Sequence, residues 1–355
     1  MHFGLFCLMT QRDRQRGPSQ IYRDTTEQVK LVEQAGFEIA WFAEHHFSNY
    51  CLCPSPLTMT TYMAGQTERI KLGPAVIVAP LYEPIRLLED IGMADQISNG
   101  RLVLGFGTGY QEYEFQKFGV ELSTGRARML ELLDFVEAYL DGEPLSFNGE
   151  HIHFSETYFS VRTMQPRPAI YVAGLAGDME TQRRAVQRGY IPFFTTGWNR
   201  LDVLSGIRDK VESAYVAAGG DAARMPFALQ RYVFVTDDAK EAELAADGAR
   251  YVRRVAMSMR NKYARLDGAF LEELPAPDEP PLDEIIDRLL IGSPEVVAEK
   301  LVREIETLRP THISCFMAIP GVSQPRILRS IERFGAEVMP LLGKYLHADA
   351  ACGRQ

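Results

Sequence analysis

The sequence predicts a (β/α)8 TIM barrel, and two observations lead to this fold class. Eight short apolar runs alternate with longer amphipathic stretches along the 355 residues. Most runs are continuously apolar, which is typical of parallel strands covered on both faces. Strands and helices alternating in this number favour a closed barrel over an open doubly wound sheet. The predicted strands are residues 2–8, 38–43, 70–79, 101–107, 169–174, 190–196, 227–235 and 312–318.

The stretches between these strands carry helix end signals. The first predicted helix ends at Gly36, where a glycine is favoured just after the last turn. Asp178 is placed to cap a helix that closes at Gly189. Ser293 followed by Pro294 is typical of an N-cap and a first helical residue.

Two segments interrupt the alternation of strands and helices. We expect a single barrel domain over residues 1–355, with insertions near 143–168 and 262–290. The first insertion resembles a strand pair with a proline-bounded link, and the second a loop with a short helix. Excursions on this side of a barrel can act as lids, a role that the sequence leaves open.

Composition argues against several classes of function. The net charge of −9 disfavours a nucleic-acid partner, because phosphate binding needs a basic patch. No apolar run reaches the roughly 18 residues of a membrane span, so no membrane partner is expected. The apolar start, "MHFGLFCLM", is interpreted as a first strand rather than a signal peptide. Five scattered cysteines form neither a disulfide framework nor a zinc pattern, which favours a cytoplasmic location.

Three titratable residues follow the second predicted strand. The stretch "AEHHF" places Glu44, His45 and His46 at a strand end, where barrels gather catalytic groups. Histidine titrates near neutrality and suits proton transfer. Adjacent strand residues face opposite ways, so the two histidines cannot serve one site in the same manner. The alternative is an ordinary polar loop.

Glycines gather at the ends of two later strands. Gly105, Gly107 and Gly109 let a flat or phosphorylated ligand approach the backbone, or they ease a barrel corner. Their alternating spacing does not fit the dinucleotide-binding fingerprint. The stretch 173–178, "AGLAGD", runs into a helix N-terminus that can hold a phosphate or form an ordinary loop.

His151 and His153 share one face of a predicted strand, a spacing that can ligate a metal. The HxH motif of barrel metallohydrolases is expected after the first strand, where this chain has "LFCLMT". We therefore expect an exposed hairpin face and no metal.

An ordered series of motifs resembles the bacterial luciferase-like family of flavin-dependent monooxygenases. The series comprises "AEHHF" (43–47), "ERIKLGPAVIVAP" (68–80), the stretch 83–119 with its "GFGTGY" loop, and "YVAGLAGDMETQRRAVQRG" (171–189). The resemblance implies a barrel that binds reduced FMN (FMNH2), captures O2 as a C4a-hydroperoxide and oxygenates a small organic substrate. It also implies a separate flavin reductase and a homodimer. Light emission is not implied.

The resemblance also implies roles for individual residues. His45 matches the histidine of proton transfer, Glu44 and His46 match its neighbours, and Glu114 falls where luciferases carry an aspartate thought to influence the ionisation of the flavin. The positions matched to cofactor contacts are Ala75, Thr108, Tyr110, Ala173, Gly174, Gly177 and Asp178. Phe6, Trp41, Phe106, Tyr110, Phe194 and Trp198 are expected to build a water-excluding cavity.

Two departures from the luciferase pattern keep alternatives open. Thr108 replaces an arginine that contacts phosphate, and Gly174 with Leu175 replaces a Glu-Ser pair. The alternatives are an F420-dependent enzyme that transfers hydride on the same barrel, and a non-catalytic flavin-binding barrel.

Overall fold

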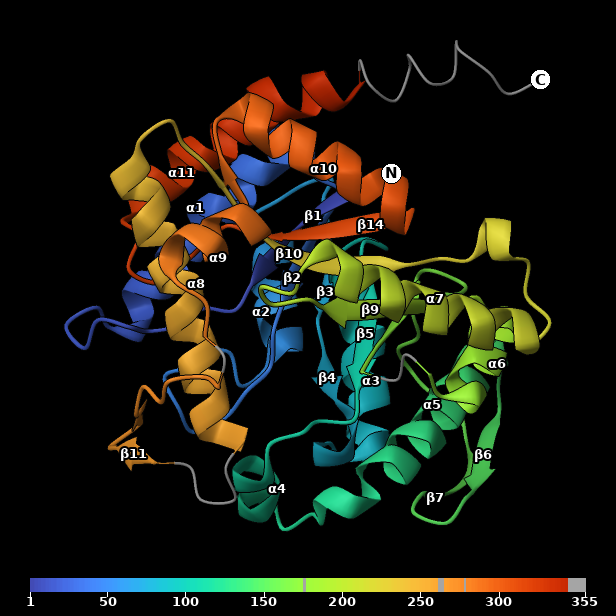
Figure 1. The fold of residues 1–355 in the computed structure, drawn as a ribbon. Helices are drawn as coiled ribbons and strands as arrows, with labels where there is room; N and C mark the ends of the chain where they lie inside the picture. The colour runs from blue at the N-terminus through green and yellow to red at the C-terminus, as the bar shows by residue number, and fades with distance from the viewer. Residues whose placement is uncertain (175–176, 261–264, 278, 344–355) are drawn as a thin grey trace, which may run out of the picture.

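A nearly closed barrel of parallel strands forms the centre of the computed structural model, which describes residues 1–174, 177–260, 265–277 and 279–343 (Figure 1). The predicted fold class is confirmed. The strands lie in the order β3 (Lys71–Pro74), β2 (Ile39–Phe42), β1 (His2–Cys7), β14 (His312–Phe316), β10 (Ala228–Val235), β9 (Ile191–Thr195), β8 (Ile170–Ala173), β5 (Leu104–Gly107) and β4 (Ile77–Val78).

The third predicted strand is divided in two, and this division brings the ends of the sheet together. Strand β3 pairs with β2, whereas β4 pairs with β5 on the other side. A parallel bridge joins Leu72 of β3 to Leu102, two residues before β5, and so nearly closes the barrel. The predicted strand 70–79 therefore forms two short strands, one paired with β2 and the other with β5. The sequence pattern did not predict this division.

The glycines of β3 and β5 allow this junction to pack. A Cβ on Gly73 would lie 2.1 Å from the carbonyl oxygen of Val103, and one on Gly105 would lie 2.3 Å from that of Pro74. A Cβ on Gly107 would lie 2.6 Å from Val76. These glycines thus allow close packing at the barrel corner. Gly107 and Gly109 also line the cavity described below, so the alternative of ligand approach stays open for them.

Helices cover the outside of the barrel (Figure 1), and the predicted end signals are present. Asp178 accepts a hydrogen bond from the backbone N–H of Thr181, and Ser293 accepts one from that of Val296. The helices are α1 (Pro18–Gln34), α2 (Pro56–Ala64), α3 (Pro84–Ile97), α4 (Glu112–Phe118), α5 (Gly125–Asp141), α6 (Met179–Arg188), α7 (Leu201–Ala217), α8 (Ala239–Arg260), α9 (Leu282–Arg288), α10 (Pro294–Leu308) and α11 (Gln324–Arg333).

The strand pair expected in 143–168 and the short helix expected in 262–290 are present, whereas the strand pair in the second segment was not predicted. The first segment holds the antiparallel pair β6 (Leu145–Asn148) and β7 (His153–Thr157). The second holds the short pair β11 (Leu266–Asp267) and β12 (Phe270–Leu271), together with α9. Strand β13 (Leu290–Gly292) was not predicted, and it pairs with the carboxyl-terminal half of β10.

Inward-facing aromatic side chains fill the barrel near the amino ends of its strands. The Trp41 ring stacks on Phe193 with centroids 5.7 Å apart and meets Tyr171 edge-on at 4.7 Å. His312, the first residue of β14, accepts a hydrogen bond from Trp41 Nε1 at its Nε2 atom, 3.3 Å away. These contacts pack the barrel interior, and a site is expected at the carboxyl ends of the strands.

Candidate active site

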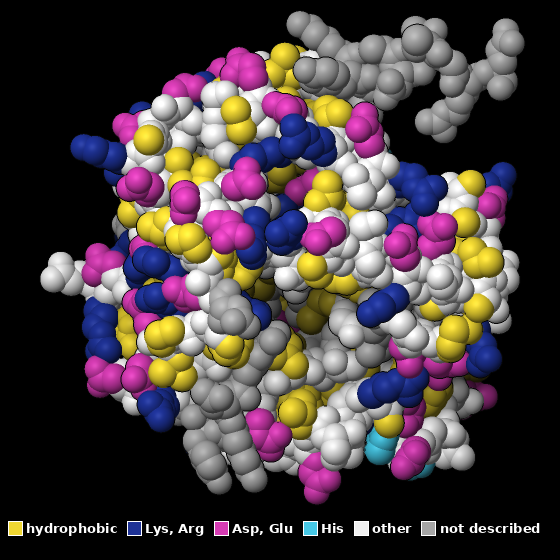
Figure 2. Space-filling view, viewed as in Figure 1, with side chains coloured by type: hydrophobic (Ala, Val, Ile, Leu, Met, Phe, Trp, Pro, Cys, Tyr) yellow, Lys and Arg dark blue, Asp and Glu magenta, His cyan; other side chains and the backbone are white. Residues whose placement is uncertain are grey.

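The carboxyl ends of the strands surround a cavity of about 530 Å³, called here the His45 cavity. Its volume falls within the range of small-molecule and cofactor pockets, about 300–1,000 Å³. Figure 2 shows apolar side chains gathered around a hollow near the middle of the face in view, with acidic and basic side chains interspersed around it. The apolar part of the wall includes Phe6, Leu8, Ala75, Val76, Phe193, Phe194, Trp198, Tyr232 and Phe316.

His45 lines this cavity and is held by Glu114 from α4. The Nδ1 atom of His45 lies 2.9 Å from Oε1 of Glu114, and the same oxygen accepts the backbone N–H of His46 at 2.8 Å. An oxygen that accepts from an N–H acts as an acceptor, so Nδ1 carries the hydrogen of the His45 pair. In the neutral imidazole, Nε2 is then the basic atom. The pair therefore fixes the tautomer of a ring at the cavity wall.

His46 forms a separate pair with Glu44. Its Nε2 lies 3.1 Å from Oε1 of Glu44, whose other oxygen accepts the Tyr82 hydroxyl at 2.7 Å and the backbone N–H of Val78 at 3.3 Å. Burial raises the pKa of Glu44, and these hydrogen bonds oppose the shift. Glu44 lines the cavity. Its carboxylate also connects the loop after β2 to Val78 and Tyr82, at the end of β4 and just beyond it. The two histidines thus belong to different pairs, as their adjacency predicts.

Two tyrosines stand beside the His45 ring. Tyr50 meets it edge-on with centroids 4.8 Å apart, and Tyr110 does so at 5.7 Å. Burial raises the pKa of Tyr50 well above its usual value, and a hydrogen bond with Tyr110 adds to the rise. Tyr50 is therefore a neutral phenol at physiological pH. The imidazole lies in a largely apolar, aromatic setting.

The positions predicted to contact a cofactor fall into two groups. Ala75, Thr108, Tyr110, Ala173 and Gly174 line the His45 cavity. Within the described ranges, Gly177 and Asp178 are not part of its lining. Leu175 and Ala176, the centre of the predicted phosphate loop, lie outside the described residues.

Asp178 has a structural role as the N-cap of α6, and it also binds Arg126. The guanidinium of Arg126 lies 2.5 Å from Oδ1 of Asp178. Burial would raise the pKa of Asp178, but hydrogen bonds from Thr181 and Arg126 outweigh it and leave the pKa below its usual value. Asp178 is thus an ionised cap, and it places the charge of Arg126 beside the predicted phosphate loop.

Four of the six side chains expected to build the cavity do line it, namely Phe6, Tyr110, Phe194 and Trp198. The expectation was wrong for Trp41 and Phe106. Trp41 belongs to the packed aromatic layer below the cavity. Phe106 is fully buried in the apolar cluster that contains Leu133 and Phe135 of α5, because residues of β5 alternate between the two faces.

Sequence reasoning missed the polar residues of β10 and α8. Gln230 and Tyr232 both line the cavity, and their spacing of two on a strand places them on one face. Ala249, Val252, Arg253 and Ala256 line it from α8, with the three- and four-residue spacing of one helix face. The spacing on β10 was available from the sequence, but the approach of α8 to the barrel mouth was not.

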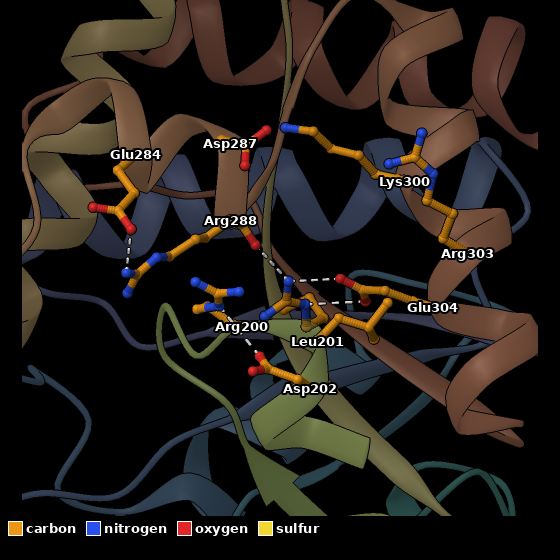
Figure 3. A pocket seen from close by; sticks show the side chains of 10 residues that line it. Arg200, Leu201, Asp202, Glu284, Asp287, Arg288, Lys300, Arg303 and Glu304 are labelled. Atoms are coloured by element: carbon orange, nitrogen blue, oxygen red, sulfur yellow. Dashed lines mark hydrogen bonds and ion pairs between the residues drawn. The ribbon is translucent and has the colours of Figure 1, made fainter. Parts of the chain in front are cut away.

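A second cavity, of about 360 Å³, lies among charged side chains outside the barrel (Figure 3) and is called here the charged cavity. Arg231 on β10 contacts Glu304 of α10 through two hydrogen bonds, of 2.6 and 3.0 Å. Arg288 pairs with Glu284, and Arg200 with Asp202. The lining thus consists largely of groups that neutralise one another.

The two histidines at metal-ligand spacing lie on the first insertion. His153 is exposed at the start of β7, and its Nδ1 lies 2.9 Å from Oδ1 of Asn148. In the part of the chain that the structure describes, no group of three or more His, Cys, Asp or Glu residues is arranged to hold a metal ion. None of the helices in the described ranges has the length and apolarity of a membrane span.

Comparison with known proteins identifies the family to which the chain is similar. A family profile described as luciferase-like monooxygenase matches residues 1–312. The chain is 38% identical over 349 residues to the uncharacterized protein y4vJ of Sinorhizobium fredii, covering 98% of this chain and 99% of that protein. It is 28% identical over 253 residues to the oxygenase component of the flavin-dependent trigonelline monooxygenase of Acinetobacter baylyi, covering 70% and 68%.

Solved structures share the fold at low sequence identity. The monooxygenase RslO1 of Streptomyces bottropensis superimposes with a TM-score of 0.83 at 21% identity, covering 96% of this chain and 99% of that one. The oxygenating constituent of 3,6-diketocamphane monooxygenase of Pseudomonas putida, in complex with FMN, gives 0.77 at 22%, covering 96% and 98%. An F420-dependent secondary alcohol dehydrogenase gives 0.73 at 17%, again covering 96% and 98%.

Proposed function

The chain belongs to the luciferase-like monooxygenase family, and we propose that it uses reduced FMN and O2 to oxygenate a small organic molecule. The observation that carries the proposal is the His45–Glu114 pair, which faces an apolar cavity at the carboxyl ends of the barrel strands. When bound, the reduced flavin supplies the electrons that let dioxygen oxidise an organic substrate. The residues of the chain supply the binding site, the exclusion of water and the movement of a proton.

The residues of the His45 cavity fit a flavin. Side chains of β1, β9 and β14 offer an apolar surface to a flat ring system. A Cβ on Gly174 or Gly197 would meet no atom of the described residues within 4 Å, so the described backbone leaves space there.

We assign proton transfer to Nε2 of His45 and the orientation of that ring to Glu114. A general acid or base works best with a pKa near the working pH, which suits imidazole. The buried Tyr50 and the exposed Tyr110 both pack against the ring. Ala75 and Tyr110 would contact the flavin ring, and Thr108, Ala173 and Gly174 would hold its phosphate end. Arg126 is bound to Asp178, the last residue of the predicted phosphate loop, and we propose that its charge supports the phosphate from outside the described lining.

A separate flavin reductase is proposed as the supplier of reduced FMN. The naming of one relative as an oxygenase component supports a divided system of this kind. We also propose a homodimer. Gel filtration with light scattering would return twice the 40.0 kDa of one chain if this is correct.

The decisive experiment mixes the protein with photoreduced FMN under argon and then admits oxygen. We expect bound reduced flavin to return to its oxidised absorbance more slowly than free flavin, because the cavity excludes water and controls proton delivery. Identical time courses with and without protein, at concentrations where FMN binds, would contradict the proposal. FMN binding without any oxygenated product from a panel of aldehydes, ketones and aromatic compounds would favour a non-catalytic flavin-binding barrel.

F420-dependent hydride transfer is the second candidate. It is favoured by the absence of an arginine at position 108 and by the likeness of the fold to an F420-dependent dehydrogenase. Equilibrium titrations with FMN and F420 separate the two. Tighter binding of F420 would replace the first proposal with the second.

A further inference from the structure

Arg253 on α8 differs from the other arginines of its helix segment. Arg250 lies 2.5 Å from Oδ1 of Asp247, and Arg254 lies 2.5 Å from Oε1 of Glu279. Arg253 forms no ion pair with any acid in the described ranges, and it is the single Lys or Arg in the described lining of the His45 cavity. A half-buried guanidinium without a carboxylate is costly unless an anion arrives to pair with it.

Two further polar side chains lie on the same side of the cavity. Gln230 is 4% exposed, and its side-chain nitrogen is buried without a partner among the described residues. Tyr232, two residues along the same face of β10, is close enough to Arg253 to feel its charge. Burial raises the pKa of Tyr232, and the positive charge of Arg253 opposes that rise. An amide, a phenol and a guanidinium therefore line one wall.

This wall is separate from the predicted phosphate end of the cavity. Helix α8 contacts the loops that follow β1 and β2, since Tyr251 accepts a hydrogen bond from Asn49 and Asp247 pairs with Arg12. Thr108 and Gly174, in contrast, follow β5 and β8, which adjoin each other and are separated from β10 by β9. A flavin with its phosphate beside β5 and β8 would leave Arg253 for the second reactant.

We propose that the organic substrate of this enzyme carries a carboxylate, which Arg253 binds with the Gln230 amide and the Tyr232 hydroxyl beside it. This inference rests on the proposed function and names the substrate class for the same site. The planar fork of a guanidinium matches a carboxylate with two parallel hydrogen bonds. One cation with two neutral polar groups suits a single negative charge. The apolar remainder of the wall would hold the body of the substrate.

The charged cavity does not compete for this role. Its buried guanidinium, Arg231, donates to both carboxylate oxygens of Glu304 and also to the Thr196 hydroxyl. Lys300 donates to the carbonyl groups of Ile286, Leu289 and Ile291, which anchors α10 to the segment before it. An anion that entered the charged cavity would have to displace existing ion pairs such as Arg231–Glu304. An anion at Arg253 would form an ion pair that is not made within the described residues.

The test measures binding of benzoate and hexanoate, and of their neutral amides, to the full chain loaded with FMN. We expect each carboxylate to bind at least about tenfold more tightly than its amide, as charge-assisted hydrogen bonds predict. Arg253→Gln should abolish this preference, and Arg253→Lys should keep part of it, because the charge remains without the fork. Arg254→Gln, on the same helix but paired with Glu279, is the matched control and should keep the preference. Thermal melting verifies that each variant is folded.

Three outcomes would count against the inference. Equal binding of carboxylates and amides by the wild type would overturn it, as would an unchanged preference in folded Arg253→Gln. A loss of affinity for FMN but not for riboflavin in Arg253→Gln would assign this arginine to the cofactor phosphate instead. Failure of the wild type to bind any flavin would refute the proposed function, while a carboxylate preference measured without flavin would still locate an anion site at Arg253.

Discussion

Nδ1 of His45 lies 2.9 Å from Oε1 of Glu114, although the two residues are separated by 69 positions in the chain. The first follows β2 and the second lies in the first turn of α4, after β5. The barrel brings both strand ends to one rim, so the imidazole gains an orienting carboxylate from a distant segment. Glu44, its neighbour in sequence, is engaged with His46 and Tyr82 instead.

We predict that the carboxylate of Glu114 acts through His45. His45→Ala should slow the formation of oxygenated product by about 100-fold or more, the usual contribution of a proton-transfer group. Glu114→Gln should slow it by a smaller factor, because an amide oxygen still orients the ring but without the charge. The rate of flavin reoxidation after oxygen is admitted should change strongly in His45→Ala and less in Glu114→Gln.

Glu112→Gln is the matched control for this prediction. Glu112 lies on the same short helix, but its carboxylate accepts a hydrogen bond from Gln116 and not from the histidine. Its rates of reoxidation and of product formation should equal those of the wild type. Equal rates for the wild type and His45→Ala would show that another group moves the proton.

The sequence predicted the strands well because burial on both faces leaves a direct mark, a continuous apolar run. It also placed His45 and Glu44 at the rim, since the end of a strand is a local property. Which carboxylate meets which histidine is not local. It depends on how the segment after β5 folds back over β2, and no spacing in the chain encodes that contact.

Trp41 and Phe106 illustrate a second limit of the sequence. Both are aromatic residues in predicted strands near the site, and both were expected at the cavity wall. Trp41 faces the barrel interior, where it packs on Phe193 and does not line the cavity. Phe106 belongs to the apolar cluster that includes residues of α5. Register within a short, continuously apolar strand cannot be obtained from its composition, because each face is apolar.

We expect Arg126 to support the phosphate of FMN. Arg126→Gln should weaken FMN binding several-fold and leave riboflavin binding unchanged, because only the phosphate would lose a positive charge. Fluorescence titrations with the two flavins measure the difference, and added salt should reduce it. Arg183→Gln, an exposed arginine on α6 that pairs with Glu180, is the control. An equal loss of affinity for FMN and riboflavin would contradict the role in phosphate binding.

His312 should make the protein less stable in acid. Burial lowers the pKa of His312 to about 3 from an ordinary value of 6.5, and the nearby charges of His2, Lys71 and the amino terminus add to the effect. The unfolded chain therefore binds a proton between these two values that the folded protein does not. The free energy of unfolding should fall as pH drops from about 6.5 towards 3, by up to about 1.4 kcal/mol per pH unit from this group.

Denaturant unfolding of His312→Gln tests this dependence. Glutamine retains an acceptor for Trp41 Nε1 but does not titrate, so the variant should show a shallower loss of stability below pH 6.5. Replacement of the exposed His153 by Gln should leave the slope unchanged. Parallel curves for the wild type and His312→Gln would assign the acid sensitivity to other groups.

The Arg231–Glu304 pair should be the ion pair most costly to break. Its side chains are 2% and 7% exposed, and Glu304→Gln would leave a buried guanidinium without its charge partner. Loss of one member of such a pair typically costs about 3–5 kcal/mol. In contrast, Glu299→Gln breaks a pair with Arg303 whose side chains are 62% and 66% exposed, and this should cost less than about 1 kcal/mol.

The double variant Arg231→Met with Glu304→Leu should recover much of the stability lost in Glu304→Gln, since neither charge is then buried alone. Equal costs for Glu304→Gln and Glu299→Gln in urea unfolding would show that the buried pair is already well solvated, and that the outer face of β10 does not depend on it.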